Sequence, residues 1–415
     1  MNLETIDTIY NCSRDFLSSL NQKYKRSFSN FSLDDARMII LLGQRGVGKT
    51  TTLIQYLLQY SKNDIDSHNI LYLPVDHVLF ANNSLFNVAK YFYDHGGKII
   101  CFDEIHKYSD WSRELKSIFD SFPRLKIIAS GSSALEIHKG SYDLSRRAIS
   151  YTLPGLSFKE FIELKHNLSL PLFTLEEILK EHSKICRKVI NTLESINKKI
   201  LPTFQEYLQS GFYPYFLQYE ANIKLYHITL EQSTHMSIEG DLTAIYPTLS
   251  GSSIKNIKKL LSHIAQLAPF KPDLSSLKKS LELSDDRTIK NYLKYLEDAH
   301  IIRSLCKSGK SLNNLDKPEK IYLNNTNLIY AFGKQNPDLG NIRETFFAST
   351  VSPHYELFYP NTGDFAFLDY IFEVGGPNKS FDQIKNDAKG YLVIDNTEYG
   401  RNHKIPLWIF GFLSS

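Results

Sequence analysis

An apolar strand, a glycine-rich loop and a helix follow one another near the start of this 415-residue chain. Residues 37–52 read RMIILLGQRGVGKTTT, so the apolar run leads directly into the motif GxxxxGKT at residues 43–50. This is the Walker A spacing, in which glycines let successive backbone N–H groups turn inward around phosphate oxygens. The helix-like run Thr51–Tyr60 then points its positive end at the same anion. The pattern predicts a phosphate-binding loop, with a glycine turn that holds no nucleotide as the alternative.

The residues of this loop have separate expected roles. We expect nucleotide contacts from the whole run Gly43, Gln44, Arg45, Gly46, Val47, Gly48, Lys49, Thr50 and Thr51. The ammonium of Lys49 can reach the β- and γ-phosphates, and the hydroxyl of Thr50 can ligate Mg²⁺. The loop thus predicts both a nucleotide and a divalent cation.

A second chemical feature follows about 50 residues later. Residues 98–106 read KIICFDEIH, a strand-like run that ends in Asp103 and Glu104. A carboxylate at a strand end beside the phosphate loop can hold Mg²⁺ through water, and its neighbour can orient or deprotonate the attacking water. Apolar runs that end in two acids are common, but the position after the loop favours a Walker B strand. We assign Asp103 to the metal and Glu104 to the catalytic base.

Strand-like and helix-like runs alternate from about residue 34 to residue 164, which favours a parallel sheet with helices on both faces. The strand candidates are Met38–Leu42, Ile70–Leu73, Lys98–Phe102 and Lys126–Ser130. Right-handed crossovers would place the loops that follow these strands at one edge of the sheet. The predicted fold class is α/β, with a P-loop NTPase core.

Two further segments are candidates for contact with the reacting phosphate. Residues 125–133 read LKIIASGSS, and either Ser130 or Ser132 could contact the γ-phosphate or the attacking water. A plain β-turn is the alternative, and the residues alone favour it. Arg146 and Arg147 precede a strand-like run and could supply an arginine finger, in cis or from a neighbouring copy in a homo-oligomer. A surface arginine pair is the alternative for that segment.

In this order, the segments GxxxxGKT, FDEIHKYSDWSRELKSIFD, KIIASGSSALEI and SRRAISYTLPGLSFKEF resemble a widespread group of prokaryotic AAA-type ATPases. The resemblance continues through residues 204–214 and into the C-terminal third. It implies ATP and Mg²⁺ as ligands, and no Asn-Lys-x-Asp guanine-reading motif occurs. In that group a glycine precedes the arginine that stands before the strand-like run. Here Arg146 stands in the place of that glycine, so Arg147 matches the finger, and we group it with Glu104 and Ser132 as catalytic candidates.

The rest of the chain divides into three predicted segments after an ATPase domain at residues 1–165. They are a helical lid or connector at 166–250, a winged helix-turn-helix at 251–320, and a restriction-endonuclease-like domain at 321–415. The connector shows no ligand spacing, and its run His227–Asp241 is interpreted as packing.

Residues 251–320 contain 14 Lys/Arg and 8 Asp/Glu, a local excess that suits contacts with DNA phosphates. The predicted second helix exposes Arg287, Lys290 and Lys294. Asp285 and Asp286 at its start would repel phosphate. DNA binding and domain packing are therefore both open for this segment.

The nuclease-like assignment comes from the family resemblance, which implies a site of two acids followed by a Glu-x-Lys. Glu344, Asp364 and Glu373 match the acids, but Gly375 occupies the lysine position. Lys379, in the adjacent loop, is a candidate substitute. A fold kept for structure or for nucleic-acid docking is the favoured alternative, and an active nuclease is the other.

The whole chain has the composition of an ordinary globular protein, and its formal net charge of +3 does not identify a partner. The four cysteines are far apart and show no metal spacing, no signal peptide is recognisable, and no apolar run is long enough to span a membrane. We expect a cytoplasmic protein. The leading hypothesis is an ATPase that drives conformational change in its C-terminal modules. An ATP-gated nuclease and a nucleotide-switched interaction protein are the alternatives.

Overall fold

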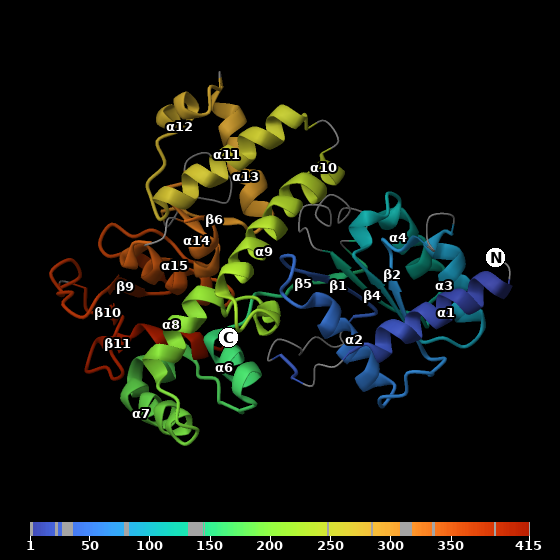
Figure 1. The fold of residues 1–415 in the computed structure, drawn as a ribbon, viewed down its shortest axis with the longest axis horizontal. Coiled ribbons are helices and arrows are strands. Elements are labelled where there is room, and N and C mark those ends of the chain that lie inside the picture. The colour runs from blue at the N-terminus through green and yellow to red at the C-terminus, as the bar shows by residue number, and fades with distance from the viewer. Residues whose placement is uncertain are drawn as a thin grey trace. The chain divides into compact units, whose positions relative to one another are not determined.

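The computed structural model describes residues 3–20, 24–26, 36–78, 83–131, 144, 146–246, 249–283, 285–307, 318–333, 337–385 and 387–414. The chain forms two compact units, residues 1–154 with 240–247 and residues 155–239 with 248–415 (Figure 1). The four-part division made from the sequence is finer than this and stays a prediction. Within the described residues, no helix has the length and apolar character needed to cross a membrane.

A five-stranded parallel sheet forms the centre of the first unit. The elements in chain order are α1 (Leu3–Ser18), β1 (Met38–Leu42), α2 (Lys49–Tyr60), β2 (Ile70–Pro74), α3 (Leu85–Asp94), β3 (Ile99–Asp103), the 3₁₀ turn η2 (Ile105–Lys107), α4 (Trp111–Ser121), β4 (Lys126–Gly131), β5 (Ile149–Thr152) and α10 (Leu242–Ile245). The strand order is β2-β3-β4-β1-β5, so β4 lies between β1 and β3. This confirms the predicted α/β, P-loop NTPase class, and each predicted strand is found within one residue of its expected bounds.

Strands β1 to β4 of this sheet are buried on both faces, which is why they read as largely apolar runs, whereas the edge strand β5 is mostly exposed. Successive side chains point to opposite faces. Ile100 and Phe102 of β3 share one apolar cluster with Phe92 of α3 and Leu115 of α4. Helix α2 contacts β3 and β4, and none of its residues belongs to that cluster. The carboxyl ends of β1, β3 and β4 are thereby fixed side by side at one edge.

The second unit combines helices with two small sheets. Its elements are α6 (Phe158–His166), α7 (Leu175–Glu194), α8 (Ile200–Ser210), the 3₁₀ turn η3 (Pro214–Gln218), α9 (Ile223–Met236), α11 (Gly251–Leu267), α12 (Leu274–Ser280), α13 (Asp286–Asp298), β6 (Ile302–Leu305), β7 (Lys320–Leu323), α14 (Thr326–Phe332), α15 (Leu339–Val351), β8 (Phe365–Phe367), β9 (Tyr370–Gly375), β10 (Gly390–Ile394), β11 (Lys404–Pro406) and the 3₁₀ turn η6 (Leu407–Phe412). The larger sheet has the order β11-β10-β9-β8, and β6 pairs with β7. A π-helical turn, η4 (Ser237–Asp241), follows α9 and leads back into the first unit.

Aromatic packing joins the helical region to the four-stranded sheet inside this unit. The ring of Phe204 on α8 lies 4.8 Å from that of Phe346 on α15, and Phe158 on α6 lies 5.9 Å from Phe412. The side chain of Asn327 is fully buried in the same unit. Its amide oxygen accepts hydrogen bonds from the backbone N–H of Phe212 and from the hydroxyl of Tyr226. The connector and the C-terminal segment are therefore parts of one core.

The basic segment folds as three helices, α11 to α13, followed by the antiparallel pair β6–β7. The second helix that the sequence predicts, with Arg287, Lys290 and Lys294, is present as α13, and β6 follows it. Asp285 caps α13, since its carboxylate accepts from the backbone N–H of Arg287 at 2.9 Å. The assignment as a winged helix stays a prediction.

Candidate nucleotide site

The glycine-rich loop connects β1 to the first residue of α2, as the sequence predicts. Gly46 and Gly48 have φ angles of 84° and 97°, a region in which other residues are strained. Gly48 is also the residue that precedes the first turn of α2. Glycine is required at these two places because the chain must turn sharply into the helix whose free N–H groups face the bound anion.

Lys49 is buried within this loop, with 5% of its surface exposed. Its Nζ donates to the carbonyl oxygens of Gly43 and Gln44, each at 3.1 Å. Burial lowers the pKa of Lys49, and the carboxylates of Glu104 and Asp103 oppose that shift. A cation held inside its own loop by two weak acceptors is well placed to exchange them for phosphate oxygens.

Asp103 lies at the end of β3 and is only 3% exposed. Its Oδ2 accepts from the hydroxyls of Thr50 and Tyr72, each at 2.6 Å. Ser130 on β4 donates to the other carboxylate oxygen. A hydroxyl and a carboxylate in contact are the oxygen donors that Mg²⁺ prefers, so the two residues fit the cation predicted for this place.

The carboxylate of Glu104 faces Lys49, with its Oε1 3.8 Å from Nζ. The backbone of Glu104 has φ 54° and ψ 40°, a left-handed conformation that is uncommon outside glycine. The backbone N–H of Glu104 donates to Ser130 at 3.1 Å. Strained backbone of this kind persists where surrounding contacts hold it, often at functional sites. The structure therefore brings Lys49, Thr50, Asp103 and Glu104 together, as the sequence predicts.

A second layer of charged groups lies behind Glu104 and was not identified from the sequence. Nε2 of His106 lies 3.6 Å from Oε2 of Glu104 and 3.7 Å from Oδ1 of Asp241. The same oxygen of Asp241 accepts from Nζ of Lys107 at 2.9 Å. Burial raises the pKa of Asp241, but hydrogen bonds from His106 and Lys107 outweigh it, so the pKa falls well below its usual range. From the sequence, Asp241 is interpreted as a packing residue, because no motif in its neighbourhood indicates this pairing.

Arg26 is another contributor that has no sequence signal. Its guanidinium is buried and donates to the carbonyl oxygens of Val47 in the loop, at 3.1 Å, and of Pro154, at 2.7 Å. It thus ties the glycine-rich loop to the segment that follows β5. A lone arginine between polar residues offers no pattern from which this contact could be read.

The other two catalytic candidates are placed differently. Arg147 makes a two-pronged ion pair with Asp120 at the end of α4, with both N–O distances 2.9 Å. The hydrogen bond from Arg147 is the main cause that lowers the pKa of Asp120. Ser132 lies outside the described residues, whereas Ser130 contacts Asp103 directly. The roles assigned to Arg147 and Ser132 stay predictions.

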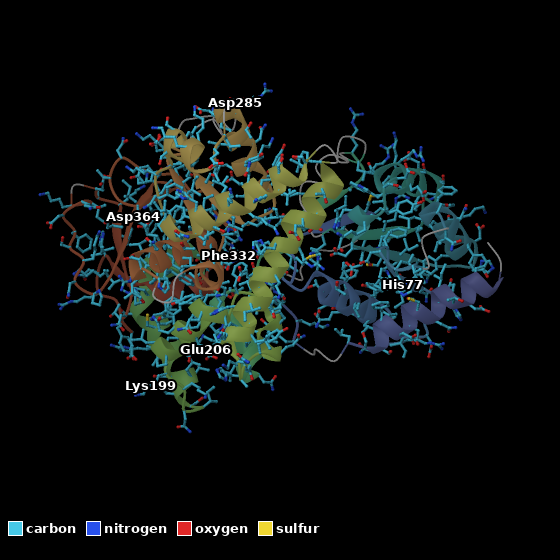
Figure 2. All side chains as sticks on the ribbon, turned by 45° about the horizontal axis from the view of Figure 1, so that its top comes forward. His77, Lys199, Glu206, Asp285, Phe332 and Asp364 are labelled. Carbon is cyan, nitrogen blue, oxygen red and sulfur yellow. The ribbon has the colours of Figure 1, made fainter. Side chains whose placement is uncertain are left out.

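The second predicted site lies at the strands of the C-terminal sheet, where Figure 2 labels Asp364. Glu344 on α15 accepts from Lys320 and, at 2.9 Å, from the hydroxyl of Tyr322. Nζ of Lys320 also lies 3.9 Å from Oδ1 of Asp364. Burial, with Asp364 nearby, raises the pKa of Glu344 and of Glu373. The carboxylate of Asp364 is therefore close enough to both acids to raise their pKa.

The side chain of Lys379 lies against Gly375, the position that the family pattern gives to its lysine. Its Nζ pairs with Glu373, whose side chain is 1% exposed. A Cβ added at Gly375 would lie 2.6 Å from Cγ of Lys379, so the lysine stem covers that glycine. Among the described residues, however, no three acids, histidines or cysteines converge closely enough for a metal site. In this structure Lys379 pairs with Glu373, and Glu344 and Asp364 pair instead with Lys320.

Two family models match separate parts of the chain. Residues 35–162 match a family model described as an AAA domain, and residues 201–339 match a domain of unknown function. An uncharacterized protein of Methanocaldococcus jannaschii is 27% identical over 312 residues, which cover 73% of this chain. The chain spans 63% of the length of that relative.

Solved structures with a similar course of the chain include the Walker-type ATPase of Pyrococcus abyssi, at 12% identity and a TM-score of 0.38, covering 72% of this chain and 92% of that one. The Aeropyrum pernix Orc1 protein in complex with DNA follows at 10% identity and a TM-score of 0.32, covering 79% of this chain and 91% of that one. These scores are too low to carry any argument about function.

Proposed function

We propose that the first unit binds Mg²⁺-ATP and hydrolyses it, and that hydrolysis drives conformational change in the C-terminal modules. The observation that carries this is the convergence of Lys49 and Thr50 with Asp103 and Glu104, from two separate segments. ATP rather than GTP is supported by the AAA domain match over residues 35–162 and by the lack of a guanine-reading motif.

The roles of the side chains follow from their contacts. Lys49 binds the β- and γ-phosphates, and the Thr50 hydroxyl with Asp103 holds the cation. The cation neutralises charge on the phosphates when it is bound. Glu104 orients the attacking water and accepts its proton. Tyr72 and Ser130 keep Asp103 fixed, because each donates to its carboxylate.

The experiment is steady-state phosphate release by the full chain, measured with Mg²⁺ and with EDTA. We expect turnover that requires Mg²⁺, and we expect Thr50→Ala to need more Mg²⁺ for half-maximal rate. Thr52→Ala is the matched control, since the Thr52 hydroxyl donates only to the carbonyl of Gly48. Wild-type turnover no higher than that of Lys49→Ala would refute the ATPase function.

The C-terminal cluster supports a second candidate, a Mg²⁺-dependent nuclease gated by the ATPase. The specific observation is the position of Lys379, which covers Gly375 and pairs with Glu373. A lysine that reaches the same place from a later position can activate water beside the carboxylates. The ion pairs of Lys320 with Glu344 and Asp364 favour the alternative, a structural cluster.

Cleavage of plasmid and single-stranded DNA in Mg²⁺ or Mn²⁺ distinguishes these alternatives. A nuclease loses cleavage in Lys379→Ala and regains part of it when Gly375→Lys is added, because the lysine returns to the family position. Lys389→Ala is the control, since that lysine pairs with exposed Asp369. No cleavage by the wild type on any DNA form would leave the structural cluster as the answer.

A further inference from the structure

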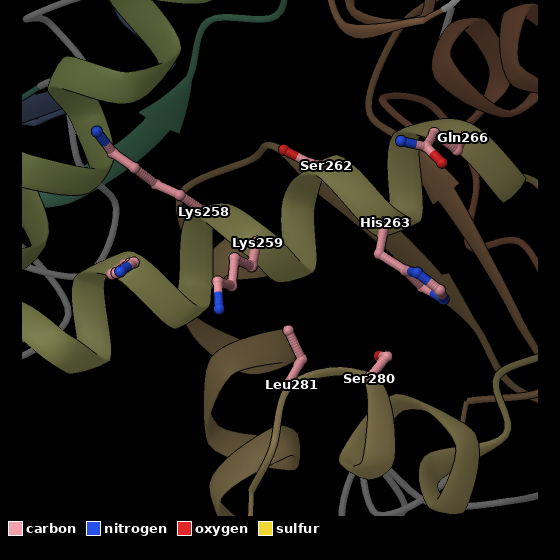
Figure 3. Close-up of a pocket in the computed structure, with 8 residues that line it drawn as sticks. Lys258, Lys259, Ser262, His263, Gln266, Ser280 and Leu281 are labelled. Carbon is pink, nitrogen blue, oxygen red and sulfur yellow. The ribbon is translucent and has the colours of Figure 1, made fainter.

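A groove runs between α11 and the end of α12 in the second unit, and nothing in the predicted sites accounts for it. Its cavity volume is about 460 Å³. The residues that line it are Lys255, Lys258, Lys259, Ser262, His263, Gln266, Ser280 and Leu281. Figure 3 shows Lys259 and His263 pointing from α11 toward Ser280 and Leu281. Cations and neutral hydrogen-bonding groups line the groove, and no carboxylate does.

Two of the three lysines that line the groove form no ion pair with the described residues. Lys255 and Lys259 are exposed and form no ion pair with any carboxylate of the described residues. Lys258 differs, since it pairs with Glu239. Unneutralised cations around a concave surface attract anions, and the attraction is strongest where no acid competes.

The shape of the basic row favours a strand over a small molecule. Lys255, Lys259, His263 and Gln266 recur at helical spacing on one face of α11. At about 1.5 Å rise per residue the row spans roughly 16 Å. A row of this length can face more than one phosphate of a nucleic-acid strand. Among the described residues that line the groove there is no Phe, Tyr or Trp, so the imidazole of His263 is the one ring there on which a base could stack.

We propose that this groove binds the sugar–phosphate backbone of a nucleic acid without reading its sequence. The proposal does not depend on ATP hydrolysis. In this proposal the phosphates contact α11, and not α13, which is the helix that the sequence predicts to contact them. On α13 the acids Asp285 and Asp286 stand at the helix start, and Asp286 already pairs with Lys278. Phosphate would therefore meet fewer repelling charges at α11.

The test is fluorescence anisotropy of the full chain with labelled 30-nucleotide probes of mixed sequence, single-stranded and duplex, at 50 and 200 mM KCl. Lys255→Gln with Lys259→Gln should weaken binding about tenfold at low salt and lower the salt slope by roughly two. Arg287→Gln with Lys294→Gln removes two exposed charges from α13 and should change affinity less than about twofold.

Each other outcome overturns the proposal. A loss confined to the α13 variant would assign binding to the predicted recognition helix. Equal losses in both variants would mean that net charge alone attracts the probe. No binding by the wild type at 50 mM KCl would leave the groove without this ligand.

A different observation supports a second inference, which rests on the proposed ATPase function. We infer that Asp241 and His106 are positioning residues for Glu104. The ring of His106 is 3% exposed and its Nε2 lies between the two carboxylates. Asp241 fixes that ring, and the ring faces the oxygen of Glu104 that does not face Lys49. Removing Asp241 should let Glu104 leave its working orientation while the phosphate loop stays intact.

Asp241→Asn should lower kcat about tenfold to a hundredfold, because small misplacements of a catalytic group are costly. ATP affinity should stay within about twofold, and in a Glu104→Gln background the same change should have no further effect. Lys107→Gln is the matched control: it removes the other partner of Asp241 but leaves His106 in place, so turnover should persist.

Normal turnover of Asp241→Asn would refute the positioning role alone. So would a loss of equal size in Lys107→Gln, or a further loss in the Glu104→Gln background. Wild-type turnover at the level of Lys49→Ala would instead refute the ATPase function on which this role depends.

Discussion

The molecule contains two clusters that combine carboxylates with a lysine, and they differ in how the lysine is held. In the first unit, Lys49 is buried, donates to two carbonyl oxygens of its own loop and stands 3.8 Å from Glu104. In the second unit, Lys379 reaches back over Gly375 to a carboxylate that is itself buried. The first lysine is free to exchange carbonyl partners for phosphate, whereas the second neutralises an acid. The first cluster therefore has a cation that a ligand can engage, whereas the charges of the second cluster neutralise one another.

The largest difference should appear in nucleotide binding. Lys49→Ala should weaken ATP binding by at least about a hundredfold, because it removes a buried cation that faces the phosphates. Lys379→Ala should leave ATP affinity unchanged. Isothermal titration or a fluorescent ATP analogue measures both. Lys98→Ala, at an exposed lysine just before β3, controls for loss of charge from the first unit. Weaker ATP binding in Lys379→Ala would break the comparison.

The free energy of unfolding, in contrast to ATP affinity, should depend on Lys379. Lys379→Ala leaves the buried carboxylate of Glu373 without its cation, which should cost about 1–3 kcal/mol of unfolding free energy. Lys389→Ala removes a solvent-exposed pair in the same sheet and should have no measurable effect. Urea unfolding followed by circular dichroism checks both. Equal stability of Lys379→Ala and the wild type would show that Glu373 does not need its partner.

A fall in pH should reduce the stability that Asp241 contributes in the first unit and increase the stability that Glu373 contributes in the second. The pKa of Asp241 is lowered on folding, so its contribution is present above its unfolded pKa of about 3.9 and is lost as pH falls. The pKa of Glu373 is raised, chiefly by burial, so stability is lost as pH rises above about 4.3. Thermal melts between pH 3 and 7 should show Asp241→Asn most harmful at neutral pH. Glu373→Gln should become relatively more favourable as pH rises.

The nucleotide site was largely predictable because its chemistry is written in short contiguous runs. The motif at residues 43–50 and the acids after β3 each follow a buried strand, and parallel pairing places such strand ends together. For the same reason, the ends of the four predicted strands agree with the structure to within one residue. The sequence alone therefore places Glu104 and Asp103 beside Lys49.

The supporting residues could not be predicted in this way. Asp241 and Arg26 reach the site from distant parts of the chain, and their local sequence shows neither a motif nor a periodic pattern. Such contacts depend on how whole elements pack, which single-sequence patterns do not determine. Lys379 is an intermediate case, because the glycine at position 375 signalled that a lysine was missing from its expected place.

The smallest expected effect concerns the fixing of Asp103. Tyr72→Phe removes one hydroxyl that donates to this carboxylate at 2.6 Å but leaves Thr50 and Ser130 in place. One such bond to a charged group is worth about 1.5–3 kcal/mol at most, and the remaining donors should limit the loss in kcat to about tenfold. Tyr93→Phe, on α3, is a control of the same chemistry. A rate below that of Asp103→Asn would mean that Tyr72 has a role of its own.

The most direct measurement of the ATPase account is the turnover and ATP affinity of Glu104→Gln in the full chain. The substitution keeps the size of the side chain and removes its basicity. We predict that ATP still binds with near wild-type affinity, while kcat falls by about 10² to 10⁴, the range expected for loss of a general base. Hydrolysis at the wild-type rate by Glu104→Gln would contradict the account.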